Sequence, residues 1–322
     1  MAAIARSSFL EVKEFEAQYK NHLSGYASWD QKEHADKWLL FEENIGGKLS
    51  IDEIAVTNGE LYTVVTNKKA KGGKGSLVAI AAGTKASEMI TVLKKIPINI
   101  REKVLEVTLD MSNSMDSIIK GSFPKVTIVT DRFHVQQLVS EAVQEIRIFL
   151  RKKAIKEESK AILRARRNKK KKAYKPPNYE NEDTKKQLLA RSRYLLFKPS
   201  SKWTEKQKQR AVILFREFPE LQHAYNLSMM FRSWYENSSS KEQAKVGLQR
   251  WYTKVDEENL EPFLVAAESI KAYEDTVLNY FNNRSTNASA ESFNAKLKGF
   301  RTLVRGVRDV KFFLFRVSKL YG

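Results

Sequence analysis

The chain has 322 residues, of which 42% are hydrophobic and 11% aromatic, enough for one large or two ordinary globular domains. It contains no cysteine, which excludes disulfides, thiol catalysis and cysteine-based zinc modules. Lys and Arg total 57 against 38 Asp and Glu, a net charge of +19 that indicates a polyanionic partner, with nucleic acid as the first candidate. No run approaches the roughly 20 apolar residues of a membrane span, and the charged N-terminus is atypical of a secretory signal. We therefore expect a cytoplasmic, DNA-associated protein without a membrane partner.

The first half of the chain predicts a mixed α/β arrangement. Apolar residues recur every three or four positions over residues 8–47, which predicts a helical lead-in. Three strand-like runs separated by Asn-Gly and Gly-Gly turns follow and are typical of an antiparallel meander. These runs are residues 48–56, 59–69 and 74–84. A helix broken by Pro97, a strand that ends at Asp110, a second helix and a strand that ends at Asp131 complete the pattern of one sheet with helices.

The second half predicts helices only. Residues 135–177 form a long helical pattern whose second part becomes steadily more basic and which two prolines end. Further amphipathic patterns follow, and a polar stretch rich in Ser and Asn precedes a helix that carries Glu291, Asn294 and Lys298 at helical spacing. The aromatic residues of this half have Leu and Phe neighbours, so we expect most of them in the core and base stacking for at most one. These residues are Trp203, Trp234, Tyr235, Trp251 and Tyr252.

Carboxylates on strands are the first candidates for chemistry. Asp52 interrupts an apolar strand, which by itself is typical of an exposed strand face. The recurrence of such carboxylates at Asp110, together with the helical Glu291, favours an all-oxygen site for Mg²⁺ or Mn²⁺. Two such ions activate the attacking oxygen and stabilise the leaving oxygen in phosphoryl transfer. From strand positions alone, Asp131 is nearly as good a candidate as Asp110.

Four stretches of the sequence resemble bacterial insertion-sequence transposases of the DDE type, in the same order. The similarity is to the branch with an Asp-x-x-His or Cys-x-x-His motif one strand after the second Asp, a feature shared with Mutator-like transposases. In this chain that motif is DRFH, with Asp131 and His134. The four stretches are KLSIDEIAV, VLEVTLDMSNSMDSIIKGSFPKVTIVTDRFHV, RSRYLLFKPSSKWT and STNASAESFNAKLKGF.

The resemblance implies an RNase H-like mixed sheet with a large all-α insertion between the second Asp and the Glu. Carried over residue by residue, the catalytic and metal-binding carboxylates are Asp52, Asp110 and Glu291, with two Mg²⁺ or Mn²⁺ ions as cofactors. Asp131 is the alternative to Asp110 or a supporting residue, and the other supporting residues are His134, Asn294 and Lys298. The implied domains are a helical lead-in (1–47), the first part of the catalytic core (48–149), the insertion (150–283) and the helix with Glu291 (284–322).

The function implied by the resemblance is cleavage of insertion-sequence ends and strand transfer into target DNA. Two other hypotheses stay open: a metal-dependent nuclease or resolvase on the same fold, and a non-catalytic basic DNA-binding protein. The basic run RARRNKKKK is typical of a solvated arm, and we expect it to lie against DNA phosphates. Its residues are Arg164, Arg166, Arg167, Lys169, Lys170, Lys171 and Lys172.

The expected partners are the element ends, target DNA and a second copy of the chain, in a homodimer on DNA. Transposases of this branch carry an N-terminal DNA-binding region, whereas only about 50 residues precede Asp52 and none is cysteine. We therefore expect end recognition to come from a separate polypeptide or from the short lead-in.

Overall fold

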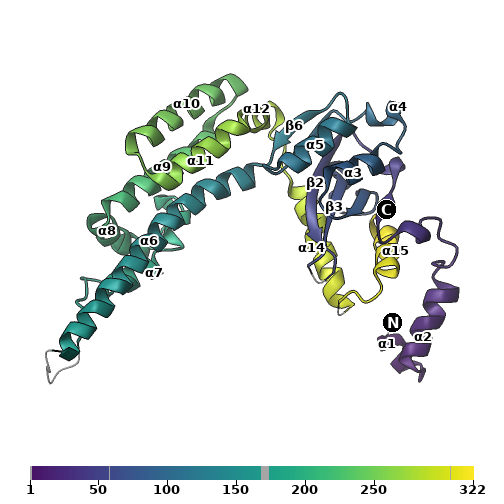
Figure 1. The fold of residues 1–322 in the computed structure, drawn as a ribbon, viewed down its shortest axis with the longest axis horizontal. Helices are drawn as coiled ribbons and strands as arrows, with labels where there is room; N and C mark the ends of the chain where they lie inside the picture. Colours follow the sequence, from purple (N-terminus) through teal and green to yellow (C-terminus); the bar gives the residue numbers. More distant parts are fainter. Residues whose placement is uncertain (1, 58, 168–173, 305) are drawn as a thin grey trace. The chain divides into compact units, whose positions relative to one another are not determined.

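The computed structural model describes residues 2–57, 59–167, 174–304 and 306–322 (Figure 1). These residues form two compact units, of which unit 1 comprises Met1–Asp131 and Arg284–Gly322 and unit 2 comprises Arg132–Asn283. The chain therefore leaves unit 1 after its last strand and returns to it for its last helices. Within the described residues, no helix is both long and apolar enough to cross a membrane.

Unit 1 is built on a six-stranded mixed sheet with the order β1-β4-β3-β2-β5-β6. β2, β3 and β4 form the expected antiparallel meander, and β5 and β6 run parallel to β2. This sheet and the helical region after it confirm the predicted RNase H-like α/β class. The strands are β1 Trp38–Leu40, β2 Lys48–Ala55, β3 Leu61–Asn67, β4 Leu77–Ala82, β5 Glu106–Leu109 and β6 Thr127–Thr130.

The lead-in differs from the continuous helical pattern expected up to residue 47. The strand β1 lies within the lead-in and pairs with β4 at the edge of the sheet. With only three residues, β1 is too short to show the alternation of apolar and polar residues that predicts a strand. Two of the apolar positions in this pattern are also exposed, since Phe9 is 98% and Leu23 is 70% accessible. The helical elements of the lead-in are α1 Ala2–Ser7, α2 Val12–Gln18, η1 Tyr19–Leu23, η2 Lys32–His34 and η3 Glu42–Asn44.

Successive strand residues point to opposite faces of the sheet, and each face has its own core. On one face Ile51 and Val107 pack with α3 (Ala86–Leu93) and α5 (Asn113–Ser122). On the other face Ile54 and Val64 pack with α14 (Ala288–Leu303) and α15 (Val310–Tyr321). Figure 1 shows α14 beside β2 and β3 in unit 1. The last part of the chain therefore completes the core of its first part.

Unit 2 is helical, as predicted, and the described residues form no strand after β6. The long basic helix α6 runs from Arg132 to Arg167, so the expected domain limit at residue 149 falls inside one helix. Trp234, Tyr235, Trp251 and Tyr252 are all buried, which confirms their expected place in the core. The other helices are α7 Lys185–Arg191, η5 Leu195–Phe197, η6 Ser200–Lys202, α8 Glu205–Glu217, α9 Pro219–Asn237, α10 Lys241–Glu258, α11 Glu261–Ala272, α12 Glu274–Leu278 and α13 Tyr280–Asn283.

One glycine sets how closely α14 approaches the sheet. Gly72 has φ +68°, and a Cβ built on it would lie 2.9 Å from the backbone nitrogen of Phe293 and 2.9 Å from the Ser292 hydroxyl oxygen, both on α14. Its carbonyl oxygen accepts a hydrogen bond of 2.7 Å from Lys296 of the same helix. A side chain at this position would therefore push α14 away from the turn after β3.

We predict that Gly72→Ala lowers the free energy of unfolding by about 1–3 kcal/mol, because it adds both a steric overlap and an unfavourable positive φ. Gly299→Ala on α14 is the matched control, since a Cβ there meets no atom within 4 Å. The control should be neutral or stabilise by up to about 1 kcal/mol, because alanine favours a helix interior. Urea unfolding of both variants measures the difference, and equal midpoints would contradict the role given to Gly72.

Candidate active site

Three aspartates lie side by side on neighbouring strands, with Asp52 inside β2 and Asp110 and Asp131 directly after β5 and β6. β2 and β5 are parallel with Ser50 beside Thr108, so the same register places Asp52 beside Asp110 two residues later. The parallel register of β5 and β6 likewise places Asp110 beside Asp131. Strand alternation directs all three to the face that α14 covers. Asp52 and Asp110 are half-buried, whereas Asp131 is only 2% exposed.

Helix α14 crosses this row of aspartates. The backbone N–H of Asn287, its N-cap residue, donates to Asp131 Oδ1 over 3.1 Å. Two turns later, the side-chain amide of Asn294 donates to Asp52 Oδ2 over 2.6 Å. Asn287 and Asn294 are seven residues apart, a helical rise of about 10.5 Å. That length matches the distance of roughly 9.6 Å across two strand spacings, so α14 lies over the aspartates along its first two turns.

Glu291 lies on α14 between these two contacts. It is four residues after Asn287 and three before Asn294, so the three residues share one helix face. This position places Glu291 near the middle strand of the three, β5, after which Asp110 follows. Its side chain is exposed, in contrast to the buried Asn294. Among the described residues, the ligand atoms that the structure brings together are those of Asp110, Asp131 and His134, whereas Asp52 and Glu291 lie outside this group. The joint role of Asp52, Asp110 and Glu291 therefore stays a prediction.

Two residues of the DRFH motif belong to a group of side chains with ligand atoms for a cation. The side-chain ligand atoms of Asp110, Asp131 and His134 all lie within 4.8 Å of one another. His134 follows Asp131 by three residues, in the first turn of α6, so a short stretch of chain sets its position beside the strand end. Two ligands of one Mg²⁺ or Mn²⁺ ion lie at most about 4.2 Å apart, since each bond is about 2.1 Å. The limit of 4.8 Å for these ligand atoms is therefore slightly wider than one such ion requires. Carboxylates suit both ions, and the imidazole nitrogen is also a transition-metal ligand, so the donor set fits a divalent cation.

The backbone around Asp52 also orients its carboxylate. The N–H of Glu53 donates to Asp52 Oδ1 over 2.8 Å, so both oxygens of Asp52 accept a hydrogen bond. Burial, and secondly the negative charge of Asp110, raise the pKa of Glu53. In the sequence Glu53 is only the neighbour of Asp52, and nothing in its strand pattern indicates its proximity to Asp110.

A largely buried basic residue that the sequence did not single out lies close to the aspartates. Lys68, in the turn after β3, is 3.6 Å from the carboxylate of Glu106 on β5. Its side chain is 13% exposed, which is unusual for lysine. It stands in the sequence NKKAKGGK, where nothing distinguishes it from the other lysines of a solvated turn.

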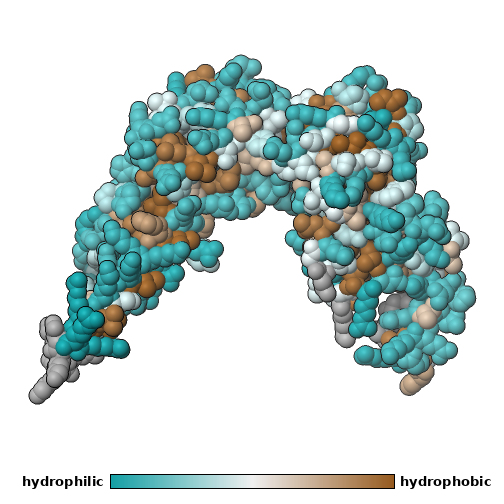
Figure 2. Space-filling view, viewed as in Figure 1, coloured by the Kyte–Doolittle hydropathy of each residue, from teal (hydrophilic) through white to brown (hydrophobic). Residues whose placement is uncertain are grey.

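The remaining residues named from the sequence lie on exposed surfaces. Lys298 is exposed on α14, one turn after Asn294. Arg164, Arg166 and Arg167 are exposed in the last turn of α6, where Figure 2 shows a mostly hydrophilic surface. Lys169, Lys170, Lys171 and Lys172 lie outside the described residues.

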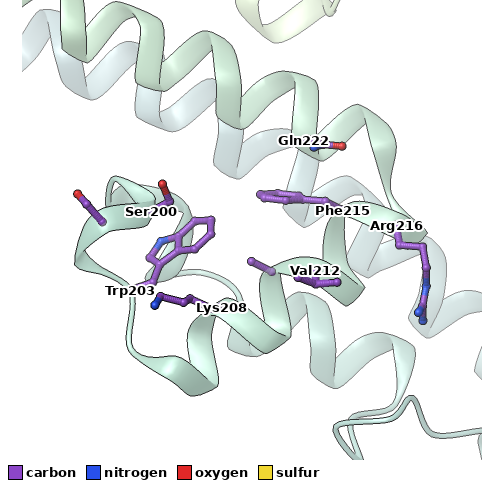
Figure 3. A pocket seen from close by; sticks show the side chains of 9 residues that line it. Ser200, Trp203, Lys208, Val212, Phe215, Arg216 and Gln222 are labelled. Carbon is purple, nitrogen blue, oxygen red and sulfur yellow. The ribbon is translucent and has the colours of Figure 1, made fainter.

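Unit 2 contains a hollow of about 650 Å³ beside α8. Figure 3 shows the Trp203 ring on one side and Phe215 on the other, with Lys208 near its rim. Trp203 is only partly buried, and its indole N–H donates to the carbonyl of Leu195 over 2.8 Å. Trp203 is therefore the member of the aromatic set that offers ring surface to the outside, and base stacking by it stays a prediction.

The comparison with known families decides the class of the protein. A transposase family model, that of the ISL3-type DDE transposases, matches residues 49–317. The chain belongs to this transposase family. The match begins in β2 and ends in α15, so it covers the aspartates, the whole of unit 2 and α14. No curated protein matches the chain. As a transposase, the protein cleaves and transfers DNA, and DNA is its partner.

We predict that Asn294→Ala lowers the rate of DNA cleavage by about 10–100-fold, because Asp52 loses the donor that orients it. Thr302→Ala on the same helix is the control, since its exposed hydroxyl donates to the carbonyl of Lys298, within α14 itself. Single-turnover cleavage with a labelled DNA end measures both rates. If the two variants cleave equally fast, the contact between Asn294 and Asp52 has no part in catalysis.

Proposed function

We propose that this transposase cuts the ends of its insertion sequence and joins the new 3′ ends to target DNA, with Asp52, Asp110 and Glu291 as the catalytic carboxylates. The observation that carries the proposal is the position of Glu291 on α14, between one contact to Asp131 and another to Asp52. In this proposal, three carboxylates from three separate elements hold the ions in one region of unit 1. The family match supports the reaction class, and the register of the strands supports the choice of residues.

Two chemical steps are required of this site. Water first attacks the phosphodiester at the end of the element and releases a 3′-OH, and that 3′-OH then attacks a phosphodiester of the target. Two Mg²⁺ or Mn²⁺ ions, when bound, activate the attacking oxygen and stabilise the leaving oxygen in each displacement. Asp52, Asp110 and Glu291 would hold these ions, and Asp131 and His134 extend the donor set beside Asp110. Glu53 N–H and Asn294 keep Asp52 in one orientation.

The basic end of α6 supplies a DNA-binding surface in this proposal. Arg164, Arg166 and Arg167 are exposed within the last turn of the helix. The two acidic residues of the same half, Glu157 and Glu158, lie 3.0 Å and 2.7 Å from lysines of α7. The acids are thus balanced locally, and the arginines add positive charge at the end of the helix. Such a surface suits phosphates, which carry no base information.

The first prediction from this proposal concerns the carboxylates. Asp52→Asn, Asp110→Asn and Glu291→Gln should each lower Mg²⁺-dependent cleavage of a labelled element end by at least about 100-fold, because each removes a charged ligand worth several kcal/mol in the transition state. DNA affinity should stay near that of the wild type, since the basic surface is unchanged.

Asp116→Asn is the matched control for this prediction, since it also removes one carboxylate from unit 1, at a site where Asp116 pairs with Lys120. Full loss of cleavage in Asp131→Asn with activity retained in Asp110→Asn would reassign the second catalytic aspartate. Cleavage without any joining to target DNA would favour a nuclease. Unchanged cleavage in all three catalytic variants would contradict the site.

The second prediction concerns the end of α6. Replacing Arg164, Arg166 and Arg167 with Gln should weaken binding equally for all DNA sequences and reduce the slope of log K against log salt by up to about 2.7, or 0.9 per phosphate contact. A triple variant of Lys85, Lys120 and Lys125, each ion-paired in unit 1, removes the same charge elsewhere and is the control. Filter binding at several salt concentrations measures the slope. A sequence-selective loss of affinity would instead mean that this helix end reads bases.

A further inference from the structure

The turn after β3 contains a lysine that is far less exposed than lysines usually are. Lys68 begins the short helix η4 (Lys68–Ala70), and its side chain is 13% exposed. Burial lowers the pKa of Lys68, while the negative charges of Glu106 and Asp131 act in the opposite direction. A buried ammonium group is unfavourable unless it is paired and hydrogen-bonded, so its partners indicate what the residue stabilises.

The ammonium group of Lys68 has three polar partners. It donates to the hydroxyl of Thr108 over 2.5 Å and to the hydroxyl of Ser285 over 2.5 Å. It also lies 3.6 Å from Glu106 Oε1, the oxygen to which Ser285 donates its own hydroxyl proton. Lysine has three N–H donors, of which two bond to these hydroxyl groups, while Glu106 lies at ion-pair distance from the same ammonium group.

The same partners connect two parts of the active site. Thr108 is on β5, two residues before Asp110, and points to the same face of the sheet. Ser285 is two residues before Asn287, whose N–H contacts Asp131, and six residues before Glu291. The ammonium group therefore joins the strand that leads to one catalytic carboxylate to the segment that leads to another.

Charge balance alone does not account for Lys68. Glu106 already has a second cation, since Lys48 lies 3.4 Å from its other oxygen. The side chain of Lys48 is 51% exposed, and it contacts neither hydroxyl group in the described structure. The two lysines thus share one carboxylate, but only Lys68 contacts the segment before α14 as well.

We propose that Lys68 is a positioning residue of the transposase, which ties the start of α14 to β5 and so holds Glu291 beside Asp110. This inference rests on the proposed function for its effect on catalysis. Its structural part, the docking of α14, does not depend on that function. The turn that carries Lys68 also contacts α14 through Gly72, so one short segment holds the helix at two places.

The test compares Lys68→Met with Lys48→Met, since both substitutions remove one lysine charge beside Glu106. Hydrogen exchange of the full chain, measured by mass spectrometry, reports the docking of the peptide 284–294. Steady-state cleavage reports kcat and KM. We expect faster exchange of this peptide and a kcat lower by about 10–100-fold in Lys68→Met, as for other residues that orient catalytic ligands. KM and DNA affinity should stay within about threefold, and Lys48→Met should resemble the wild type in all measurements, as expected for an exposed ion pair.

The proposal is overturned if the exchange of peptide 284–294 is the same in Lys68→Met and the wild type, or if both lysine variants lower kcat equally. If Lys68→Met does not fold, Ser285→Ala takes its place, since it removes the tether and leaves the ammonium group with Thr108 and Glu106. An unchanged kcat and unchanged exchange in Ser285→Ala then overturn the proposal. If the wild type does not cleave DNA at all, the proposed function fails, while hydrogen exchange still decides whether Lys68 docks α14.

Discussion

The candidate active site depends on the docking of α14 against β2 and against the carboxyl ends of β5 and β6. Two hydrogen bonds to carboxylates define this docking, from Asn287 to Asp131 and from Asn294 to Asp52. Hydrogen bonds to charged groups typically contribute about 1.5–3 kcal/mol each, more than neutral ones. The apolar contacts of Phe293 and Leu297 with the sheet add the non-directional part of the interaction. The same contacts that stabilise unit 1 therefore also set the position of Glu291.

This arrangement explains how residues far apart in the sequence meet at one site. In the sequence, the whole of unit 2 is inserted between Asp131 and the segment that begins at Arg284. The cost of closing a loop grows only slowly with its length, so a large insertion is tolerated if the returning segment has strong local contacts. Those contacts form within the first few residues of the returning segment. Ser285 bonds to Glu106 on β5 and to Lys68, and the N–H of Asn287 bonds to Asp131. Docking is thus re-established within a few residues of the return of the chain to unit 1.

Sequence patterns predicted the fold well where an element was long enough to show its period. The meander, the alternating strands and helices and the all-helical second half follow from apolar runs and turn residues. β1 was not predicted, because its three residues carry no period and its pairing with β4 is a tertiary contact. The break at Phe9 was not predicted either, since apolar spacing does not show that this residue lies between α1 and α2 with φ +56°.

The candidate site was predictable in part. Asp110 and Asp131 both follow strands, and the structure shows that these strands are neighbours in register, so both carboxylates lie at one site. Strand patterns alone do not show which of the two is catalytic. The two aspartates differ in their burial and in the contact of Asp131 with the N-cap of α14, and both are tertiary features. Lys68 could not be recognised at all, since its role depends on Ser285, more than two hundred residues away in the sequence.

The central claim is that Asp52, Asp110 and Glu291 hold the catalytic ions together. Anomalous diffraction from crystals of the transposase soaked with Mn²⁺ and an element-end DNA tests it most directly, because Mn²⁺ positions are seen independently of any activity. The account predicts anomalous peaks within about 2.3 Å of carboxylate oxygens of Asp52, Asp110 and Glu291. A single peak held by Asp110, Asp131 and His134, with Asp52 and Glu291 outside bonding distance, would contradict it.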